Sequence, residues 1–158
     1  MKPLAQGSFA SSHGVAIRCL ILAVSVVPLA CRRAPEAKEV EAARNRFFAA
    51  ISSYDPDSIR AAATPDIALL EDGLVWSMDS LLSTVTWLEE EGLRIEYAFE
   101  NDRVRLEGPV AWMTYKNRGI LSAEGGADTL HWVESALFRE EEGEWKMILL
   151  HSTRIEPR

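Results

Sequence analysis

The sequence predicts an α+β domain in which helices come first and strands follow. Apolar residues recur at the 3.6-residue spacing of helices in two early segments, 36–53 and 78–90. Alternating apolar, β-branched and aromatic residues, which are typical of strands, dominate the later segment 93–153. Short charged turns that contain glycine, such as 140–143, separate the predicted strands.

The two last strands organise the rest of the chain. They are predicted at 129–139 and 144–153, and both carry apolar residues on both faces, so other elements must cover each face in places. Glu134 and Ser152 are polar exceptions within these apolar runs, as are His131 and His151. Burying such a group without a partner costs about 1–3 kcal/mol, so each buried one needs a hydrogen bond.

The first helix is predicted over 36–53, with Pro35 at its start and a buried stripe that includes Val40, Phe47 and Ile51. A short second helix is predicted over 56–63, capped by Asp55, and Thr64-Pro65 should end it.

A small hairpin is predicted next, with strands 67–70 and 74–76. Ser77 should cap a third helix, 78–90, which Gly92 ends. Alternation then predicts strands at 93–99, 103–107 and 110–120.

The first thirty residues differ from the rest, because they contain no Asp or Glu and only two basic residues, Lys2 and Arg18. The apolar run 19–30 is too short to span a bilayer as a helix and matches the core of a secretory signal. A buried N-terminal helix is the alternative, but Pro28 and the abrupt change to RRAPEAKE argue against it. We therefore expect residues 1–30 to be a signal peptide that directs export.

Cys31 would be the single cysteine of the exported chain, so it has no internal disulfide partner. The segment 28–31, Pro-Leu-Ala-Cys, resembles a bacterial lipobox, in which the cysteine carries the lipid. That resemblance implies a lipoprotein held in the periplasm, or on the outer membrane because Arg32 is not a retention aspartate, with residues 31–37 as a tether. Ordinary cleavage near Ala30, which gives a secreted protein, is the alternative.

The charge of the chain excludes one class of partner. Its net charge is −7, and loss of Lys2 and Arg18 with the signal would make it more acidic. An acidic surface repels phosphate backbones, so we do not expect nucleic acid to bind. The expected contact with a membrane is through the lipid anchor alone.

The helix order and the strand sequence resemble the NTF2-like superfamily, in its DUF4440/SnoaL-like branch. The segments that carry the resemblance are LRIEYAFENDRVRLEGPVAWMTY and WVESALFREEEGEWKMILLHS. It implies a cone-shaped domain over 38–155, with a curved antiparallel sheet wrapped around about three helices and a pocket inside. It also implies pairing into a homodimer through the outer sheet face. The superfamily contains isomerases, cyclases, dehydratases, binding domains and assembly modules, so it does not fix one function.

Three residues are candidates for catalysis of the ketosteroid-isomerase or SnoaL type. Such a reaction needs a carboxylate or histidine base in an apolar pocket and a donor to a developing oxyanion. Glu134, His151 and Tyr115 would supply these groups. The alternatives are a structural carboxylate at Glu134 and an ordinary histidine at a strand end.

Five aromatic residues are candidates for the wall of a ligand pocket, with core packing or a dimer face as alternatives. They are Trp76, Trp87, Tyr97, Trp112 and Trp132. We expect no cofactor, and three scattered histidines predict no metal site. The leading hypothesis is an exported, lipid-anchored domain that binds a small apolar or amphipathic ligand or a protein partner. An isomerase, cyclase or dehydratase and a homodimeric assembly module are the alternatives.

Overall fold

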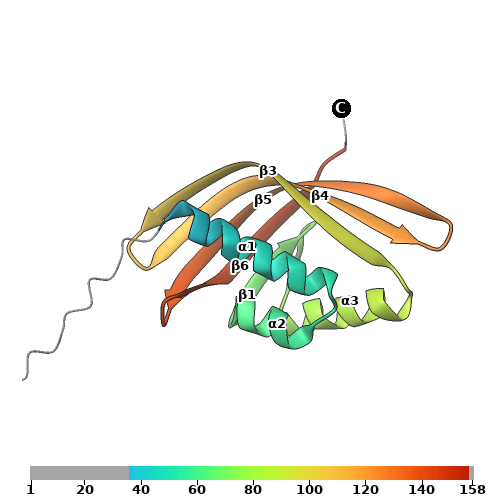
Figure 1. Cartoon of the computed structure of the whole chain (residues 1–158), viewed down its shortest axis with the longest axis horizontal. Coiled ribbons are helices and arrows are strands. Elements are labelled where there is room, and N and C mark those ends of the chain that lie inside the picture. Colours follow the sequence, from blue (N-terminus) through green and yellow to red (C-terminus); the bar gives the residue numbers. More distant parts are fainter. Residues whose placement is uncertain (1–35, 157–158) are drawn as a thin grey trace, which may run out of the picture. The chain divides into compact units, whose positions relative to one another are not determined.

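Six strands form one curved sheet in the order β2-β1-β6-β5-β4-β3, and three helices lie within its curve (Figure 1). The computed structural model describes residues 36–156, which lie within one packed unit, Ala34–Arg158. The predicted α+β class and its curved sheet around three helices are confirmed. The elements are α1 (Ala37–Ser52), α2 (Pro56–Ala62), β1 (Ala63–Glu71), β2 (Leu74–Trp76), α3 (Met78–Glu90), β3 (Arg94–Glu107), β4 (Val110–Ala123), β5 (Gly126–Glu141) and β6 (Glu144–Arg154).

The helices begin and end close to the predicted residues because their caps are explicit in the sequence. In α1, Glu36 and Glu39 form a reciprocal capping box. The Asp55 side chain accepts from the first backbone N–H groups of α2, and Ser77 does the same for α3. The α1 stripe with Val40, Phe47 and Ile51 is buried, as predicted.

The sheet is mixed, which corrects the prediction of a wholly antiparallel one. β1 pairs in parallel with β6, while every other neighbouring pair is antiparallel. A parallel pair needs a long crossover, and here the chain from β2 to β5 supplies it. β1 is also longer than predicted: Thr64-Pro65 lies inside it, at an irregularity in register between Ala63 and Ala68, where proline is tolerated.

Two irregularities shift the alternation of the sheet. The predicted strands 93–99 and 103–107 form one strand, β3, which contains a bulge between Glu100 and Arg103. In β6, the register shifts opposite Leu137 and Phe138. This shift moves Leu150 and Ser152 onto the same buried face as Met147, whereas simple alternation along the strand would place them on the opposite face.

The N-terminal predictions lie outside the described residues. These are the signal peptide 1–30, Cys31 and most of the tether 31–37. Within 36–156, none of the helices has the length and hydropathy needed to cross a membrane.

Candidate functional site

A row of polar side chains crosses the inner face of the sheet. Tyr115 on β4 pairs in register with Glu134 on β5, Glu134 pairs with Ser152 on β6, and Ser152 pairs with Glu71 on β1. Four neighbouring strands therefore each contribute one polar residue to the same line. Because facing residues of adjacent strands lie about 5 Å apart, each of these side chains can reach the next.

Glu71, Glu134 and Ser152 of this row border a cavity of about 180 Å³ between the sheet and the helices, whereas Tyr115 is not part of its lining. Most of its lining is apolar, and the polar members include Glu71, Asn117, Glu134 and Ser152. A small cavity that is mainly apolar and has few polar groups is the usual form of a ligand site. The apolar and aromatic lining comes from Phe47, Phe48 and Ile51 of α1, Leu81, Val85 and Leu88 of α3, and Leu69, Trp76, Ile95, Tyr97, Trp132 and Leu150 of the sheet.

Glu134 is the most strongly perturbed acid beside this cavity. It is 4% exposed, and its Oε1 atom accepts hydrogen bonds from Asn117 Nδ2 at 3.2 Å and from Ser152 Oγ at 3.1 Å. Burial raises the pKa of the Glu134 carboxyl to about 7, although these hydrogen bonds oppose the rise. The group therefore changes charge near neutral pH, which is the range in which a general acid or base works best.

Several polar atoms beside Glu134 have no hydrogen-bond partner among the described residues. They are Glu134 Oε2, Asn117 Oδ1 and the Tyr115 hydroxyl. Burial, followed by the charge of Glu134, raises the pKa of Tyr115, so its hydroxyl stays protonated. The hydroxyl is near enough to Glu134 to influence it, but it makes no hydrogen bond of standard geometry. Unpaired buried groups are costly, so three together indicate a place for a ligand or water.

Glu71 is a second carboxyl at the cavity that the sequence interpretation assigned only to a turn. Burial raises its pKa, and a hydrogen bond with Ser152 opposes that rise. A signal was present in the sequence, because Ile67, Leu69 and Glu71 alternate along one strand face. The predicted strand ends at Leu70, one residue before Glu71.

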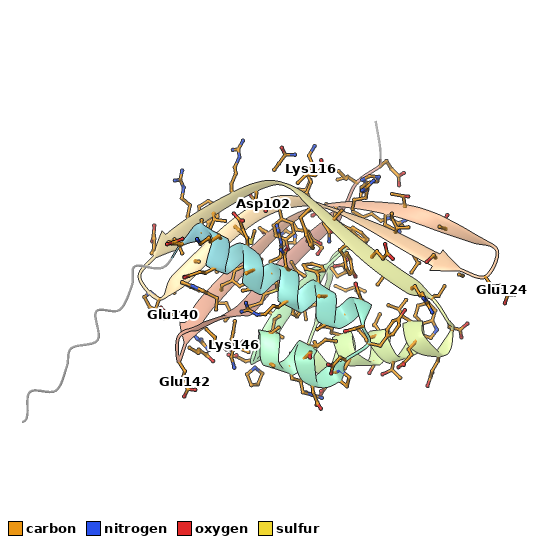
Figure 2. All side chains as sticks on the ribbon, in the orientation of Figure 1. Asp102, Lys116, Glu124, Glu140, Glu142 and Lys146 are labelled. Atoms are coloured by element: carbon orange, nitrogen blue, oxygen red, sulfur yellow. The ribbon has the colours of Figure 1, made fainter. Side chains whose placement is uncertain are left out.

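Arg44 and Asp102 form a buried ion pair behind the polar row, which the sequence interpretation also missed. Arg44 is 3% exposed, and its Nη1 atom lies 2.6 Å from Asp102 Oδ1. The guanidinium also stacks on two rings, 4.0 Å from the centroid of Phe99 and 4.8 Å from that of Tyr115. Figure 2 shows Asp102 beside α1, on the side of the sheet opposite to Lys116. The pair thus supports the ring of Tyr115 from the side of α1.

The structure separates the three catalytic candidates. Tyr115 and Glu134 lie side by side in the inner row. His151 pairs in register with Ser135, its side chain is exposed, and it is not part of the cavity lining. It follows Leu150 by one residue and so faces away from the cavity.

The aromatic candidates divide in the same way. Trp76, Tyr97 and Trp132 line the cavity. Trp112 does not, because it lies on the outer face of β4, where it is 42% exposed. Trp87 does not either, because it lies on the outer side of α3 and is 51% exposed.

Among residues 36–156, no group of three or more His, Cys, Asp or Glu is arranged to hold a metal ion. A larger groove of about 890 Å³ lies near the C-terminal end of the described chain, and its charged lining residues, Glu100, Lys116, Arg118 and Glu156, are all exposed. That groove contains no buried acid or base, so the interior cavity is the better candidate.

Comparison with solved structures identifies the fold. An NTF2-like protein from Cytophaga hutchinsonii superimposes with a TM-score of 0.67 at 10% identity, covering 77% of this chain and 100% of its own. A ketosteroid isomerase-like protein from Erwinia carotovora atroseptica gives 0.60 at 20% identity, covering 76% and 96%. The CaMKII hub of S. rosetta gives 0.63 at 17% identity, covering 78% and 100%. At these identities the likeness shows the fold alone.

Comparison with sequences identifies the family. A search of curated proteins gave no significant match. The family model for the SnoaL-like domain matches residues 40–154, which span all but the first turn of the described fold. The chain therefore belongs to the SnoaL-like domain family, and its fold is similar to that of an NTF2-like protein.

Proposed function

We propose that this domain binds a small, largely apolar molecule in its interior cavity, with a polar group of that molecule against Glu134. The observation that carries the proposal is a buried carboxyl with an unpartnered oxygen at the edge of a mainly apolar cavity. A fold that only needed a core would place an apolar side chain at this position, because an unpaired polar group costs about 1–3 kcal/mol.

The volume limits the size of the ligand. An apolar cavity of about 150 Å³ is enough to hold one benzene molecule. The cavity here is about 180 Å³, so it suits a single ring or a short branched chain with one polar substituent. Larger molecules would require α1 or α3 to move away from the sheet.

Ligand-induced stabilisation of the purified full chain tests this function. Benzyl alcohol should raise the melting temperature and change the tryptophan fluorescence, because Trp76 and Trp132 line the cavity. Val85→Phe places a ring in the cavity and should abolish both effects. Val75→Phe, the same change at an exposed position, is the matched control. If both variants respond to the alcohol like the wild type, the cavity is not the binding site.

A second function, acid–base catalysis, is favoured by the pKa of about 7 at Glu134. An ionised Glu134 would remove a proton next to a carbonyl group, and the Tyr115 hydroxyl would donate a hydrogen bond to the enolate oxygen. The structural neighbour from Erwinia, described as ketosteroid isomerase-like, is in keeping with this chemistry.

Exchange of the α-protons of a small ketone in D₂O measures this proton removal directly. Glu134→Gln should remove any exchange above background, and equal exchange by both proteins would count against the reaction.

We also propose that the chain is exported and carries a lipid on Cys31. The apolar segment before Cys31 and the lipobox-like residues 28–31 support this proposal. Expression in a Gram-negative bacterium with radiolabelled palmitate should label the wild type but not Cys31→Ala. Labelling of both, or of neither with the chain released into the medium, would contradict the lipid anchor.

We further propose that the domain forms a homodimer through the outer face of the sheet. Val110, Trp112 and Val133 are large apolar residues exposed on this face, and one structural neighbour is described as a hub. Light scattering of the full chain should give twice the monomer mass. The Trp112→Glu variant should give the mass of one monomer. Glu124→Gln, at the tip of the β4–β5 hairpin (Figure 2), should leave the mass unchanged.

A further inference from the structure

The charged part of the cavity lining is entirely acidic. Glu71 and Glu134 are the charged residues in the lining, and the described residues contribute no Lys, Arg or His to it. A buried carboxylate is normally matched by a cation or by several donors. Here the protein itself supplies no cation at the cavity surface.

Arg44, the buried cation on α1, is already engaged. It pairs with Asp102, and its Nε and Nη2 atoms donate to Asn45 Oδ1 at 3.1 and 3.0 Å. Its guanidinium lies over the rings of Phe99 and Tyr115 rather than in the cavity lining. It therefore supports the site from behind without neutralising Glu134.

Beside the cavity, more acceptor atoms of the described residues lack a partner than there are donors to satisfy them. Asn117 Nδ2 and Ser152 Oγ both donate to Glu134 Oε1, which leaves Glu134 Oε2 and Asn117 Oδ1 without donors. The Tyr115 hydroxyl has one proton, so it can satisfy at most one of these two acceptors. While Glu134 is ionised, the ligand that completes this arrangement must therefore bring hydrogen-bond donors.

Aromatic rings form part of the same wall. Phe48, Tyr97, Trp76 and Trp132 line the cavity together with the two carboxyls. Aromatic faces attract organic cations, and the attraction strengthens when the cation is removed from water. The carboxyls and the aromatic rings around this small cavity thus both favour a positively charged ligand.

From these contacts we propose that the ligand is a small apolar amine that binds in its protonated form. Its ammonium group, which has three N–H donors and no acceptor, would lie against Glu134 Oε2 and Asn117 Oδ1. Its apolar body would pack against the side chains of α1 and α3 that line the cavity. This inference rests on the proposed function and adds the chemical class of the ligand.

The pH dependence follows from the groups that face the cavity. Glu134 on β5 and Glu71 on β1 both have raised pKa values, while Tyr97 on β3 and Tyr115 on β4 stay neutral because burial raises theirs. The other charges act from behind this face: Asp72 and His151 influence Glu71, and Arg44 and Asp102 influence Tyr115. The side chains that α3 contributes to the lining are uncharged. Affinity for an ammonium ion should therefore rise as Glu134 loses its proton.

Calorimetric titration of the full chain with three probes of similar shape tests the proposal. The probes are benzylamine, benzyl alcohol and benzoate, measured about one pH unit below and one above the Glu134 pKa of about 7. At the higher pH, benzylamine should bind at least about tenfold more tightly than benzyl alcohol, a difference of about 1.4 kcal/mol, and benzoate should not bind. Glu134→Gln should remove the preference for the amine, whereas Glu124→Gln, with the same charge change at the distant hairpin tip, should keep it.

The outcomes separate this inference from the function on which it rests. If benzyl alcohol binds as tightly as benzylamine, or if Glu134→Gln keeps the preference, the cavity binds ligands but does not select amines. If benzoate binds best, the assigned charge of the site is wrong. If none of the three probes binds to the wild type, both the inference and the proposed function fail.

Discussion

Ser152 lies between two carboxyls on the inner face of the sheet, because it pairs in register with Glu134 on one side and with Glu71 on the other. Its hydroxyl donates to Glu134 Oε1 at 3.1 Å. A hydroxyl has a single proton to donate, so it cannot stabilise both carboxylates fully at the same time. Burial raises the pKa values of both carboxyls, and the charge of Glu71 adds to the rise at Glu134.

Glu134 should make the protein less stable as the pH rises. The pKa of its carboxyl is about 7 in the folded chain against 4.5 for the free group, so between these values the folded state binds more protons than the unfolded state. The free energy of unfolding should therefore fall from about pH 4.5 to above pH 7, with Glu134 contributing about 3 kcal/mol of the loss.

Urea unfolding of the wild type and of Glu134→Gln across this range checks the sign. A glutamine keeps an acceptor for Asn117 and Ser152 but cannot ionise, so the variant should be the more stable protein at about pH 8 and lose that advantage near about pH 5. Glu124→Gln should follow the wild-type curve. Parallel curves for wild type and Glu134→Gln would show that Glu134 ionises as easily in the folded chain as in the unfolded one.

Removing the Ser152 hydroxyl should raise the pKa of Glu134 further. The hydrogen bond from Ser152 favours the ionised carboxylate, and it is one of the interactions that hold this pKa down to about 7. Carboxyl carbon chemical shifts followed by NMR should therefore give a higher value for Ser152→Ala. Ser135→Ala, one residue further along β5 and on the opposite face, should leave the pKa of Glu134 unchanged. A change in this pKa with Ser135→Ala but not with Ser152→Ala would contradict the role of Ser152 as the donor.

The ion pair between Arg44 and Asp102 should be needed for stability mainly because Arg44 is buried. Asp102→Ala leaves an uncompensated guanidinium, and we expect a loss of about 2–3 kcal/mol. This is below the loss for fully buried pairs, because the Asp102 side chain is 25% exposed. The double variant Arg44→Met with Asp102→Ala should recover part of the loss, since methionine can pack where the stem of Arg44 lay. Denaturation of both, with Asp128→Ala as a surface control, measures this recovery, and a double variant no more stable than Asp102→Ala would contradict it.

The sequence was a good guide where a feature depends on neighbouring residues. The capping residues Asp55 and Ser77 placed the helices, and the Glu140–Gly143 turn placed the last hairpin. Glu134 was selected because it stood as an acid within an apolar strand, and the structure places it at the cavity. Local pattern and a resemblance to a known superfamily were sufficient for these features.

Features that depend on distant segments could not be predicted in this way. The bulge in β6 decided that Ser152 faces inward and His151 outward, and nothing in the strand itself marks the extra residue. The partner of Arg44 lies at a bulge in β3, far along the chain, so the helix pattern alone could not identify it. The position of Glu71 beside Ser152 follows from the parallel pairing of β1 with β6, which was not expected.

Gly119 should control the shape of the cavity through Trp132. The two residues lie on adjacent strands, and a Cβ atom at position 119 would stand 2.8 Å from Cζ3 and 3.1 Å from Cη2 of the Trp132 ring. These contacts are too close, and an indole inside a packed wall cannot bend away as a flexible side chain does. Gly119→Ala should therefore displace the ring, at a cost of about 1–3 kcal/mol in the free energy of unfolding, and weaken binding of benzyl alcohol.

Gly126→Ala is the matched control, because a Cβ there meets no atom within 4 Å. Its stability and ligand affinity should equal those of the wild type, and an equal loss in both variants would mean that the effect of Gly119→Ala comes from the backbone of the hairpin and not from Trp132.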